Sequence, residues 1–450
     1  MRLELENVGI IKKADICCEG LTVLSGKNGT GKTTIGKVLF SIVQGGNNVE
    51  ESYEHAKENY VKSSLRREVN RMRRIFPREI IDHVADPENK NNLLFLLNLG
   101  ISEKIKYDLS LLEDLIARYK GMDYATFLRF HGLDDMVDQE DLYKIVVNDL
   151  VTACETCINV LNEPNSMEKY LSNRINSFLD YSFSGQIKQI DYSGNSLITC
   201  ENNGSLIYKV RIPKDSLYES DSDSSFNIPY DSATFIDDPY VLDRFQNGTI
   251  TFPADQDDYN AQQILCEFLD GGHPDNYFLT VERNKKMSTL FEKINEIVPG
   301  EFEVTSKEAY YVFQNKKYRV GNLAAGSKQF LILKTLLING TLDDRSLLIL
   351  DEPESHLHPE WINKFAEILV ILIKDLGIHI VLSTHSPNML LALEVYANEY
   401  GILDHSHFYL GEKEADSVVF SCIDGKVNEG YLHLSVPLIK MSIAKKKFRD

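Results

Sequence analysis

Ser346-Leu347-Leu348-Ile349-Leu350-Asp351-Glu352-Pro353 is the stretch of sequence on which the fold prediction depends. Its four consecutive apolar residues, with a polar loop before them and a proline after them, predict a strand buried on both faces of a parallel sheet. Ligands of open α/β sheets bind at the carboxyl ends of the strands, so Asp351 and Glu352 are placed for chemistry. Successive strand residues point to opposite faces, and we expect Asp351 to serve Mg²⁺ while Glu352 faces an attacking water. Pro353 predicts an extended backbone at Glu352.

A glycine-rich segment near the N-terminus predicts a phosphate loop. Gly26-Lys27-Asn28-Gly29-Thr30-Gly31-Lys32-Thr33 fits the pattern G-x-x-x-x-G-K-[ST], follows the apolar strand Leu21 to Ser25 and precedes a helical pattern. Backbone N–H groups of such a loop wrap phosphates, the lysine adds positive charge and the threonine hydroxyl can ligate Mg²⁺. A glycine-rich turn without a ligand is the alternative, and the flanking strand and helix favour the phosphate loop. The predicted contacts to nucleotide are Gly26, Asn28, Gly29, Gly31, Lys32, Thr33 and Thr34.

Two further segments are candidates for the same site. The segment 322–330 precedes an apolar helix, and Gly326 at the helix start exposes N–H donors that suit either a bound phosphate or a tight turn. The segment 384–387, Thr-His-Ser-Pro, follows the predicted strand Ile378 to Ser383. Because the carboxyl ends of parallel strands share one edge, we favour a hydrogen bond from His385 to a γ-phosphate over a purely structural role.

The organisation of the chain predicts an α/β head made of residues 1–45 and 186–450, interrupted by a helical insertion at residues 46–185. Cys154 and Cys157 lie on an apolar helical stripe of this insertion, so buried packing is favoured over a CxxC redox or metal pair.

Two segments after the insertion have different patterns. Short alternating runs between residues 187 and 212 are separated by turn residues and predict a small antiparallel meander. Residues 219–225 are acidic and rich in serine, and this composition predicts a loop.

The length, composition and net charge of the chain exclude several classes of protein. The 450 residues contain no apolar run long enough to span a membrane, and the N-terminal residues carry charges where a secretion signal needs an apolar block. We therefore expect a cytoplasmic protein that has no membrane partner and whose seven cysteines are reduced. The net charge of −19 argues against binding of nucleic acid by the whole surface. Arg66–Arg74 is basic, and a solvated helix face is favoured there over a nucleic-acid patch.

Four motifs together carry a family resemblance: GKNGTGKT at 26–33, NLAAGSKQF at 322–330, LLILDEPESHLHP at 347–359 and STHSP at 383–387. The combination resembles the ABC-type ATPases of the RecF, SMC and OLD kind, and within them the stand-alone ATPases of bacterial antiphage systems, such as PtuA of Septu and AriA of PARIS. The resemblance implies an α/β fold: a P-loop ABC-type ATPase head with a mixed or parallel sheet, interrupted by a large helical insertion and a small antiparallel meander. It also implies ATP and Mg²⁺ as cofactors.

The resemblance implies a role for each residue that matches a motif. Lys32 and Thr33 would hold phosphates and Mg²⁺. Asp351 would bind the metal through water, Glu352 would be the catalytic base and His385 would sense the γ-phosphate. The segment Ala325, Gly326 and Ser327 would complete the site of a second copy, so the active unit would be a head-to-tail homodimer that sandwiches two ATP molecules.

One departure from the family pattern concerns turnover. Ala324 and Ala325 stand where the family usually has serine, and the loss of a hydroxyl near the γ-phosphate predicts slow ATP hydrolysis.

The resemblance also implies a partner. OLD nucleases continue into a Toprim domain with a glutamate strand and a D-x-D pair, and residues 390–450 show no such pattern. We therefore expect an ATPase that senses a phage-derived trigger and controls a separate effector, a nuclease or a toxin. One alternative is a RecF- or SMC-like repair ATPase that clamps DNA, and another is a scaffold that binds ATP without hydrolysing it. Helices of the insertion that are broken by proline and glycine favour a compact bundle over long coiled arms.

Overall fold

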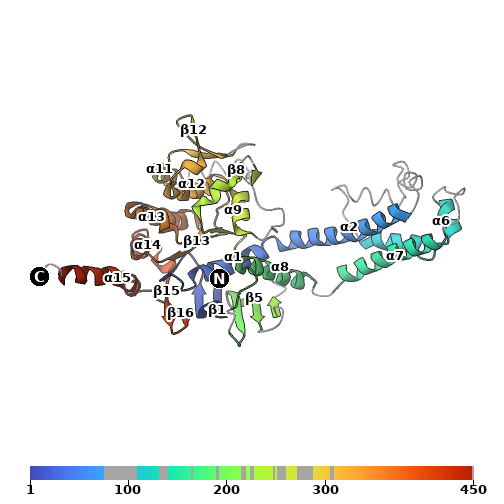
Figure 1. The fold of residues 1–450 in the computed structure, drawn as a ribbon, viewed down its shortest axis with the longest axis horizontal. Coiled ribbons are helices and arrows are strands. Elements are labelled where there is room, and N and C mark those ends of the chain that lie inside the picture. Colours follow the sequence, from blue (N-terminus) through green and yellow to red (C-terminus); the bar gives the residue numbers. More distant parts are fainter. Residues whose placement is uncertain are drawn as a thin grey trace. The chain divides into compact units, whose positions relative to one another are not determined.

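The computed structural model describes residues 1–75, 109–130, 140–163, 166–188, 192–213, 219–222, 228–246, 249–250, 260–270, 287–304 and 309–447. These residues form two compact units (Figure 1). The first contains Met1–Asn47 and Leu171–Asp450, and the second contains Asn48–Tyr170.

A mixed sheet of eleven strands runs through the described part of the first unit. Its order is β6-β5-β4-β1-β2-β16-β15-β3-β14-β13-β7, which confirms the predicted α/β fold with a mixed sheet. The strands are β1 (Arg2–Val8), β2 (Ile11–Cys17), β3 (Leu21–Gly26), β4 (Ser196–Asn202), β5 (Ser205–Ile212), β6 (Glu219–Ser222), β7 (Ser232–Ile236), β13 (Ser346–Asp351), β14 (His379–Thr384), β15 (Ser406–Glu414) and β16 (Ser417–Cys422).

The five strands β15, β3, β14, β13 and β7 are parallel neighbours. Their carboxyl ends therefore meet at one edge of the sheet, where Asp351 pairs with Ser383 and Thr384 pairs with Ser25. The strand predicted from the apolar run is β13, and residues 346 to 350 are all buried. This edge positions the candidate site.

Helices cover both faces of β13, as its apolar run predicts. Leu348 and Leu350 belong to the core that also holds Phe330 of α12 and Phe365 of α13. Ile349 points the other way, and a Cβ atom on Gly36 of α1 would lie 3.1 Å from its Cγ2 atom. The helices of this unit are α1 (Lys32–Gly46), α9 (Ala261–Asp270), α11 (Ser288–Asn295), α12 (Ala325–Ile338), α13 (Pro359–Leu376), α14 (Pro387–Glu399) and α15 (Val427–Lys447), together with α8 (Ser166–Phe183) from Leu171 onward.

Local sequence signals set the ends of two helices next to the site. Helix α13 begins at Pro359 and ends before Gly377, whose φ of 72° suits glycine. Helix α14 has Ser386 as its N-cap, and the serine side chain accepts a hydrogen bond from Met389 N. Short 3₁₀ helices connect other elements: η1 (Pro239–Arg244), η2 (Val320–Asn322), η3 (Pro353–His356) and η4 (Leu403–His405).

The predicted meander is confirmed, and one prediction beside it is wrong. Strands β4 and β5 pair antiparallel, and β4 joins β1, so the meander extends the main sheet. Glu219–Ser222, predicted as part of a loop, forms the edge strand β6. Its acidic residues lie opposite basic residues of β5, with Arg211 Nη1 3.9 Å from Glu219 Oε2, and this cross-strand charge pairing offsets the low strand propensity.

Two small antiparallel sheets are also described. One contains β8 (Phe245–Gln246) and β9 (Thr249–Ile250), and the other contains β10 (Glu301–Val304), β11 (Ala309–Phe313) and β12 (Lys316–Arg319).

The second unit is helical where it is described. Its helices are α2 (Val49–Ile75), α5 (Leu109–Tyr119), α6 (Tyr124–Phe130) and α7 (Glu140–Leu161). Cys154 and Cys157 are fully buried in its core. Arg66 and Arg67 of α2 are exposed, whereas the side chains of Arg71, Arg73 and Arg74 lie outside the described residues.

Among the described helices, none combines the length and the apolar character needed to cross a membrane.

Candidate nucleotide-binding and catalytic site

The phosphate loop joins β3 to α1 with two glycines in the left-handed region. Gly29 has a φ of 72° and Gly31 has a φ of 87°. A Cβ atom on Gly31 would lie 2.8 Å from Ile11 Cγ1, and one on Gly26 would lie 2.8 Å from Thr30 Oγ1. The loop therefore needs glycine at Gly29 for backbone conformation, at Gly26 for space and at Gly31 for both. Asn28 in the loop is exposed, and Thr34 at the start of α1 is half-buried.

Lys32 is folded back over the loop. Its side chain is 4% exposed, and its Nζ atom donates to the carbonyl oxygens of Gly26 and Lys27, at 3.0 Å each. The Nζ atom also lies 3.2 Å from Glu352 Oε1. The ammonium group is thus held where the start of α1 and the end of β13 meet.

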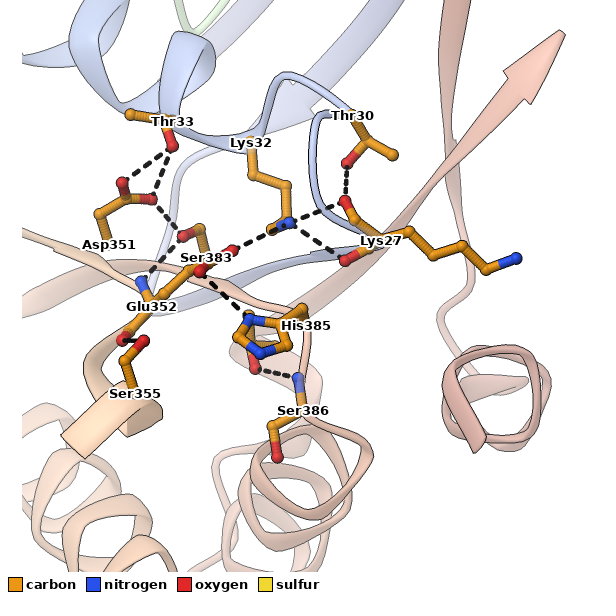
Figure 2. Close-up of polar contacts among 12 residues, drawn as sticks. Lys27, Thr30, Lys32, Thr33, Asp351, Glu352, Ser355, Ser383, His385 and Ser386 are labelled. Atoms are coloured by element: carbon orange, nitrogen blue, oxygen red, sulfur yellow. Dashed lines mark hydrogen bonds and ion pairs between the residues drawn. The ribbon is translucent and has the colours of Figure 1, made fainter. Parts of the chain in front are cut away.

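Thr33 and Asp351 are in direct contact, although they come from distant parts of the chain. The Thr33 hydroxyl lies 2.8 Å from Asp351 Oδ2 and 3.1 Å from Oδ1 (Figure 2). A hydroxyl and a carboxylate are the hard oxygen ligands that Mg²⁺ prefers, and in phosphate-binding sites this ion takes few protein ligands because water and phosphate oxygens supply the others. The pair therefore fits the predicted metal, and the described residues contain no larger cluster of His, Cys, Asp and Glu that could hold one.

Glu352 has a backbone conformation that the sequence did not predict. Its φ of 47° and ψ of 50° place it in the left-handed region, so the extended conformation expected before Pro353 is wrong. The reason lies in β14: Glu352 N donates to Ser383 O at 3.1 Å and to Ser383 Oγ at 3.0 Å. These tertiary hydrogen bonds hold a conformation that costs about 1–3 kcal/mol for a residue other than glycine, and such strain is typical of functional sites.

His385 lies beside two carboxylates at the end of β14. Its Nδ1 atom is 3.1 Å from Glu352 Oε2 and 3.8 Å from Glu354 Oε1. Figure 2 shows that Glu352 lies between Lys32 and His385, with a contact to each. Glu352 is 29% exposed and is therefore accessible to a water molecule. The predicted residues Lys32, Thr33, Asp351, Glu352 and His385 thus form one continuous group.

The segment Ala325, Gly326 and Ser327 does not join this group. It forms the first turn of α12, whose N-cap residue Ala324 makes no side-chain cap. A Cβ atom on Gly326 would lie 2.9 Å from the carbonyl oxygen of His356, so packing within the chain already requires this glycine. Among the described contacts, none connects the segment to Lys32 or Asp351, and the first-turn N–H groups are candidates for a ligand bound elsewhere.

Three site residues were missed by the sequence analysis. Ser383 Oγ donates to Asp351 Oδ1 and accepts from Glu352 N, so it orients both acidic residues. Asp237 follows β7 at the same sheet edge, and its pKa is raised, first by burial and further by the charge of Asp351. These residues look ordinary in sequence, and only the pairing of β7, β13 and β14 reveals them.

Glu354 is the third missed residue, and it is buried behind His385. Its Oε1 atom accepts from Thr384 Oγ1 and, at 3.2 Å, from His385 N. Its Oε2 atom is buried with no hydrogen-bond partner among the described residues. Burial raises the pKa of the Glu354 carboxyl above its usual value of 4.5, against the opposing effect of the hydrogen bonds.

We expect the raised pKa of Glu354 to make stability depend on pH. The folded state holds the proton more tightly than the unfolded state, so this stabilising contribution is complete below pH 4.5 and is lost as pH rises through the raised pKa. Glu354→Gln has no such proton to lose. Between pH 4.5 and 8, the wild-type free energy of unfolding should fall by about 1–3 kcal/mol relative to this variant, the cost of a buried charged oxygen without a partner.

Denaturant titrations of both proteins at the two pH values measure this difference. Glu360→Gln, a change at an exposed glutamate of α13, is the control. Parallel pH profiles for wild type and Glu354→Gln would contradict the raised pKa.

One segment of the chain matches a known protein family. Residues 315–391 match the family model described as "AAA domain, putative AbiEii toxin, Type IV TA system". This segment contains α12, β13, β14 and the residues Asp351, Glu352 and His385. Together with the phosphate loop, the match supports an ATPase. No curated protein matches the chain.

Solved structures of SMC head domains align with nearly the whole chain at low similarity. The SMC head domain from Thermotoga maritima is 11% identical over 94% of this chain and 97% of that chain, with a TM-score of 0.35. An SMC head bound to the C-winged helix domain of ScpA is 11% identical over the same shares, with a TM-score of 0.38. The Pyrococcus furiosus head with an extended coiled coil, bound to the C-terminal domain of ScpA, is 12% identical over 100% and 99%, with a TM-score of 0.29.

Proposed function

We propose that this protein binds ATP with Mg²⁺ and hydrolyses it slowly to ADP and phosphate. The observation that carries the proposal is the contact between Thr33 and Asp351, because it joins the phosphate loop to the acidic end of β13. The Lys32–Glu352 contact on the same edge supports it. This arrangement of loop, metal ligand and base is the one that phosphoryl transfer to water requires.

Each side chain has a defined task in this reaction. The loop N–H groups and Lys32 bind and orient the phosphates, and Thr33 and Asp351 hold Mg²⁺, which neutralises charge on the phosphate oxygens when bound. Glu352 accepts a proton from the attacking water, and its strained backbone aims the carboxylate at that water. His385 donates a hydrogen bond to the γ-phosphate, and Ser383 keeps Asp351 and Glu352 in position.

The active unit in this proposal is a head-to-tail homodimer. The first turn of α12 leaves N–H groups at Ala325, Gly326 and Ser327 without a side-chain cap, and these suit the γ-phosphate of ATP bound to a second copy. Ala324 and Ala325 supply no hydroxyl to that phosphate. This absence supports slow hydrolysis, and turnover of roughly hundreds per second would contradict it.

Mixing two inactive variants tests the dimer. Lys32→Ala removes the ammonium from the phosphate loop, and Ala325→Asp places a negative charge beside the second copy's γ-phosphate while remaining compatible with a helix N-terminus. In a head-to-tail dimer that contains one copy of each variant, one of the two sites is intact. It combines the unchanged phosphate loop of the Ala325→Asp copy with the unchanged α12 of the Lys32→Ala copy. The mixture should therefore regain part of the ATPase activity that each variant lacks alone.

The uncharged variant Ala325→Asn is the matched control, and it should retain more activity than Ala325→Asp. Suppose that Ala325→Asp is inactive alone and that its mixture with Lys32→Ala is inactive too. This result would rule out a contact between α12 of one copy and the ATP bound to the other.

We also propose that the ATPase is a sensor and scaffold in antiphage defence, where a phage-derived trigger relieves its control of a separate nuclease or toxin. The four motifs resemble such ATPases, and the family model that matches residues 315–391 carries the description "AAA domain, putative AbiEii toxin, Type IV TA system". Purification of the chain from its own host tests this role. Copurification of the product of a neighbouring gene would support the defence role. If no such partner copurifies and the protein acts in DNA repair, the defence role would be overturned.

A DNA-repair ATPase that clamps DNA is the second candidate function. The observation in its favour is the exposed pair Arg66 and Arg67 on α2. Binding of DNA by the purified chain that weakens steeply with salt would support it.

A further inference from the structure

One buried carboxyl group supports the turn that carries His385 from β14 to α14. Glu354 lies on η3, and its side chain is 3% exposed. Its Oε1 atom accepts hydrogen bonds from the hydroxyl of Thr384 and, at 3.2 Å, from the backbone N–H of His385. The Thr384 hydroxyl accepts in turn from Ser386 N at 2.9 Å. The positions of Thr384, His385 and Ser386 therefore all depend on one oxygen atom.

The same carboxyl group lies against the imidazole ring. His385 Nδ1 is 3.8 Å from Glu354 Oε1 and 3.1 Å from Glu352 Oε2. This nitrogen is buried, whereas the His385 side chain as a whole is 40% exposed. The exposed edge of the ring is therefore the one that faces away from the two glutamates, and it carries Nε2. In this orientation Nε2 is the atom that can donate to a γ-phosphate.

Packing alone does not explain a glutamate at position 354. The Oε2 atom of Glu354 is buried with no hydrogen-bond partner among the described residues. An apolar side chain of similar size would fill this space without an unpaired oxygen, and buried polar groups without partners cost stability. Such a cost is typical of residues that serve a functional site. The hydrogen bonds that Oε1 accepts are thus the reason for a glutamate here.

The other glutamate of the site has separate support. Glu352 N donates to Ser383 O and to Ser383 Oγ, and Glu352 O accepts from Ser355 N at 3.1 Å. The side-chain hydrogen bonds described for Glu354 go instead to Thr384 and His385. Glu354 is therefore placed to act on the position of His385.

We propose that Glu354 is a positioning residue, which holds His385 where its imidazole meets the γ-phosphate during ATP hydrolysis. The inference rests on the proposed function and extends it to a side chain that touches neither nucleotide nor metal. Glu354 acts through the acceptor atom Oε1 and not through its charge. A glutamine, whose amide oxygen also accepts hydrogen bonds, should therefore replace it in part.

Steady-state ATP hydrolysis by single variants tests the acceptor role. Glu354→Met keeps a side chain of similar length without an acceptor, and it should lower kcat by about 10- to 100-fold with KM within about threefold, because a displacement of about 1 Å can cost this much. Glu354→Gln should retain at least about fivefold more turnover than Glu354→Met, and Thr384→Val, which removes only the hydroxyl, should lose less. Glu360→Met, at an exposed glutamate, is the control. Wild-type turnover in both Glu354→Met and Thr384→Val would overturn the inference.

A double-mutant cycle identifies the residue through which Glu354 acts. In a His385→Ala background, Glu354→Met should lower kcat by less than about threefold, because the group that it positions is already absent. The same loss in both backgrounds would show that Glu354 supports some other part of the site, and it would overturn the inference.

The NMR signal of the His385 imidazole gives a readout that needs no turnover. In ¹H–¹³C spectra of the full chain, the Cε1–H signal that disappears in His385→Ala should shift in Glu354→Met and lie nearer to its wild-type position in Glu354→Gln. The signal of His405, which is 68% exposed and lies at the start of β15, should stay in place.

The two readouts separate this inference from the proposed function. An unchanged His385 signal in Glu354→Met would overturn the inference even if the wild-type protein hydrolyses ATP. A shifted signal in a protein that hydrolyses no ATP would overturn the proposed function, and with it the role of His385 at the γ-phosphate, while the contact between Glu354 and His385 would stand.

Discussion

Glu352→Gln should lower ATP turnover by about 10²- to 10⁴-fold and leave ATP binding intact. The amide is nearly the same size as the carboxylate but cannot accept a proton from water. The contacts that Glu352 N makes to Ser383 belong to the backbone and survive the substitution. ATP turnover and ATP affinity are measured separately, since a change in turnover alone identifies a group that acts in the transition state.

The control for this experiment is again Glu360→Gln, which changes an exposed glutamate near the same strand end. Its turnover should equal that of wild type. Full hydrolysis by Glu352→Gln would remove Glu352 as the base.

Lys32→Ala should weaken ATP binding by about 2–4 kcal/mol, which is roughly 30- to 1000-fold in the dissociation constant. The Lys32 ammonium is the buried positive charge of the phosphate loop, and its loss leaves the negative phosphates facing Glu352 without compensation. A titration with a fluorescent ATP analogue measures the change.

Lys27 supplies the matched control, because it belongs to the same loop and its side chain is exposed. Lys27→Ala should bind ATP within a few-fold of wild type, since exposed charges contribute little. Equal effects of the two substitutions would show that the loop attracts ATP only through general charge.

The sequence was sufficient to predict the phosphate loop and β13, because both signals are local. The pattern from Gly26 to Thr33 specifies its own turn and helix start, and four apolar residues before Asp351 specify a buried strand. The shared carboxyl edge of a parallel sheet then predicted that the two would meet, and Thr33 does contact Asp351.

Features that depend on pairing between distant strands could not be predicted. The bias of Pro353 favours an extended Glu352, and hydrogen bonds from β14 override it. Ser383 looks like any strand residue until its register with Asp351 is known.

In the proposed function, the phosphate loop and the end of β13 form one site for Mg²⁺ and ATP. Equilibrium titration of Glu352→Gln with ATP, with and without Mg²⁺, tests it most directly, because this variant should retain the nucleotide. We expect each chain to bind a single ATP saturably and to bind it more weakly when Mg²⁺ is removed. Adding Asp351→Asn should abolish this effect of Mg²⁺. Absence of saturable ATP binding, or binding that is indifferent to Mg²⁺ and to Asp351, would contradict it.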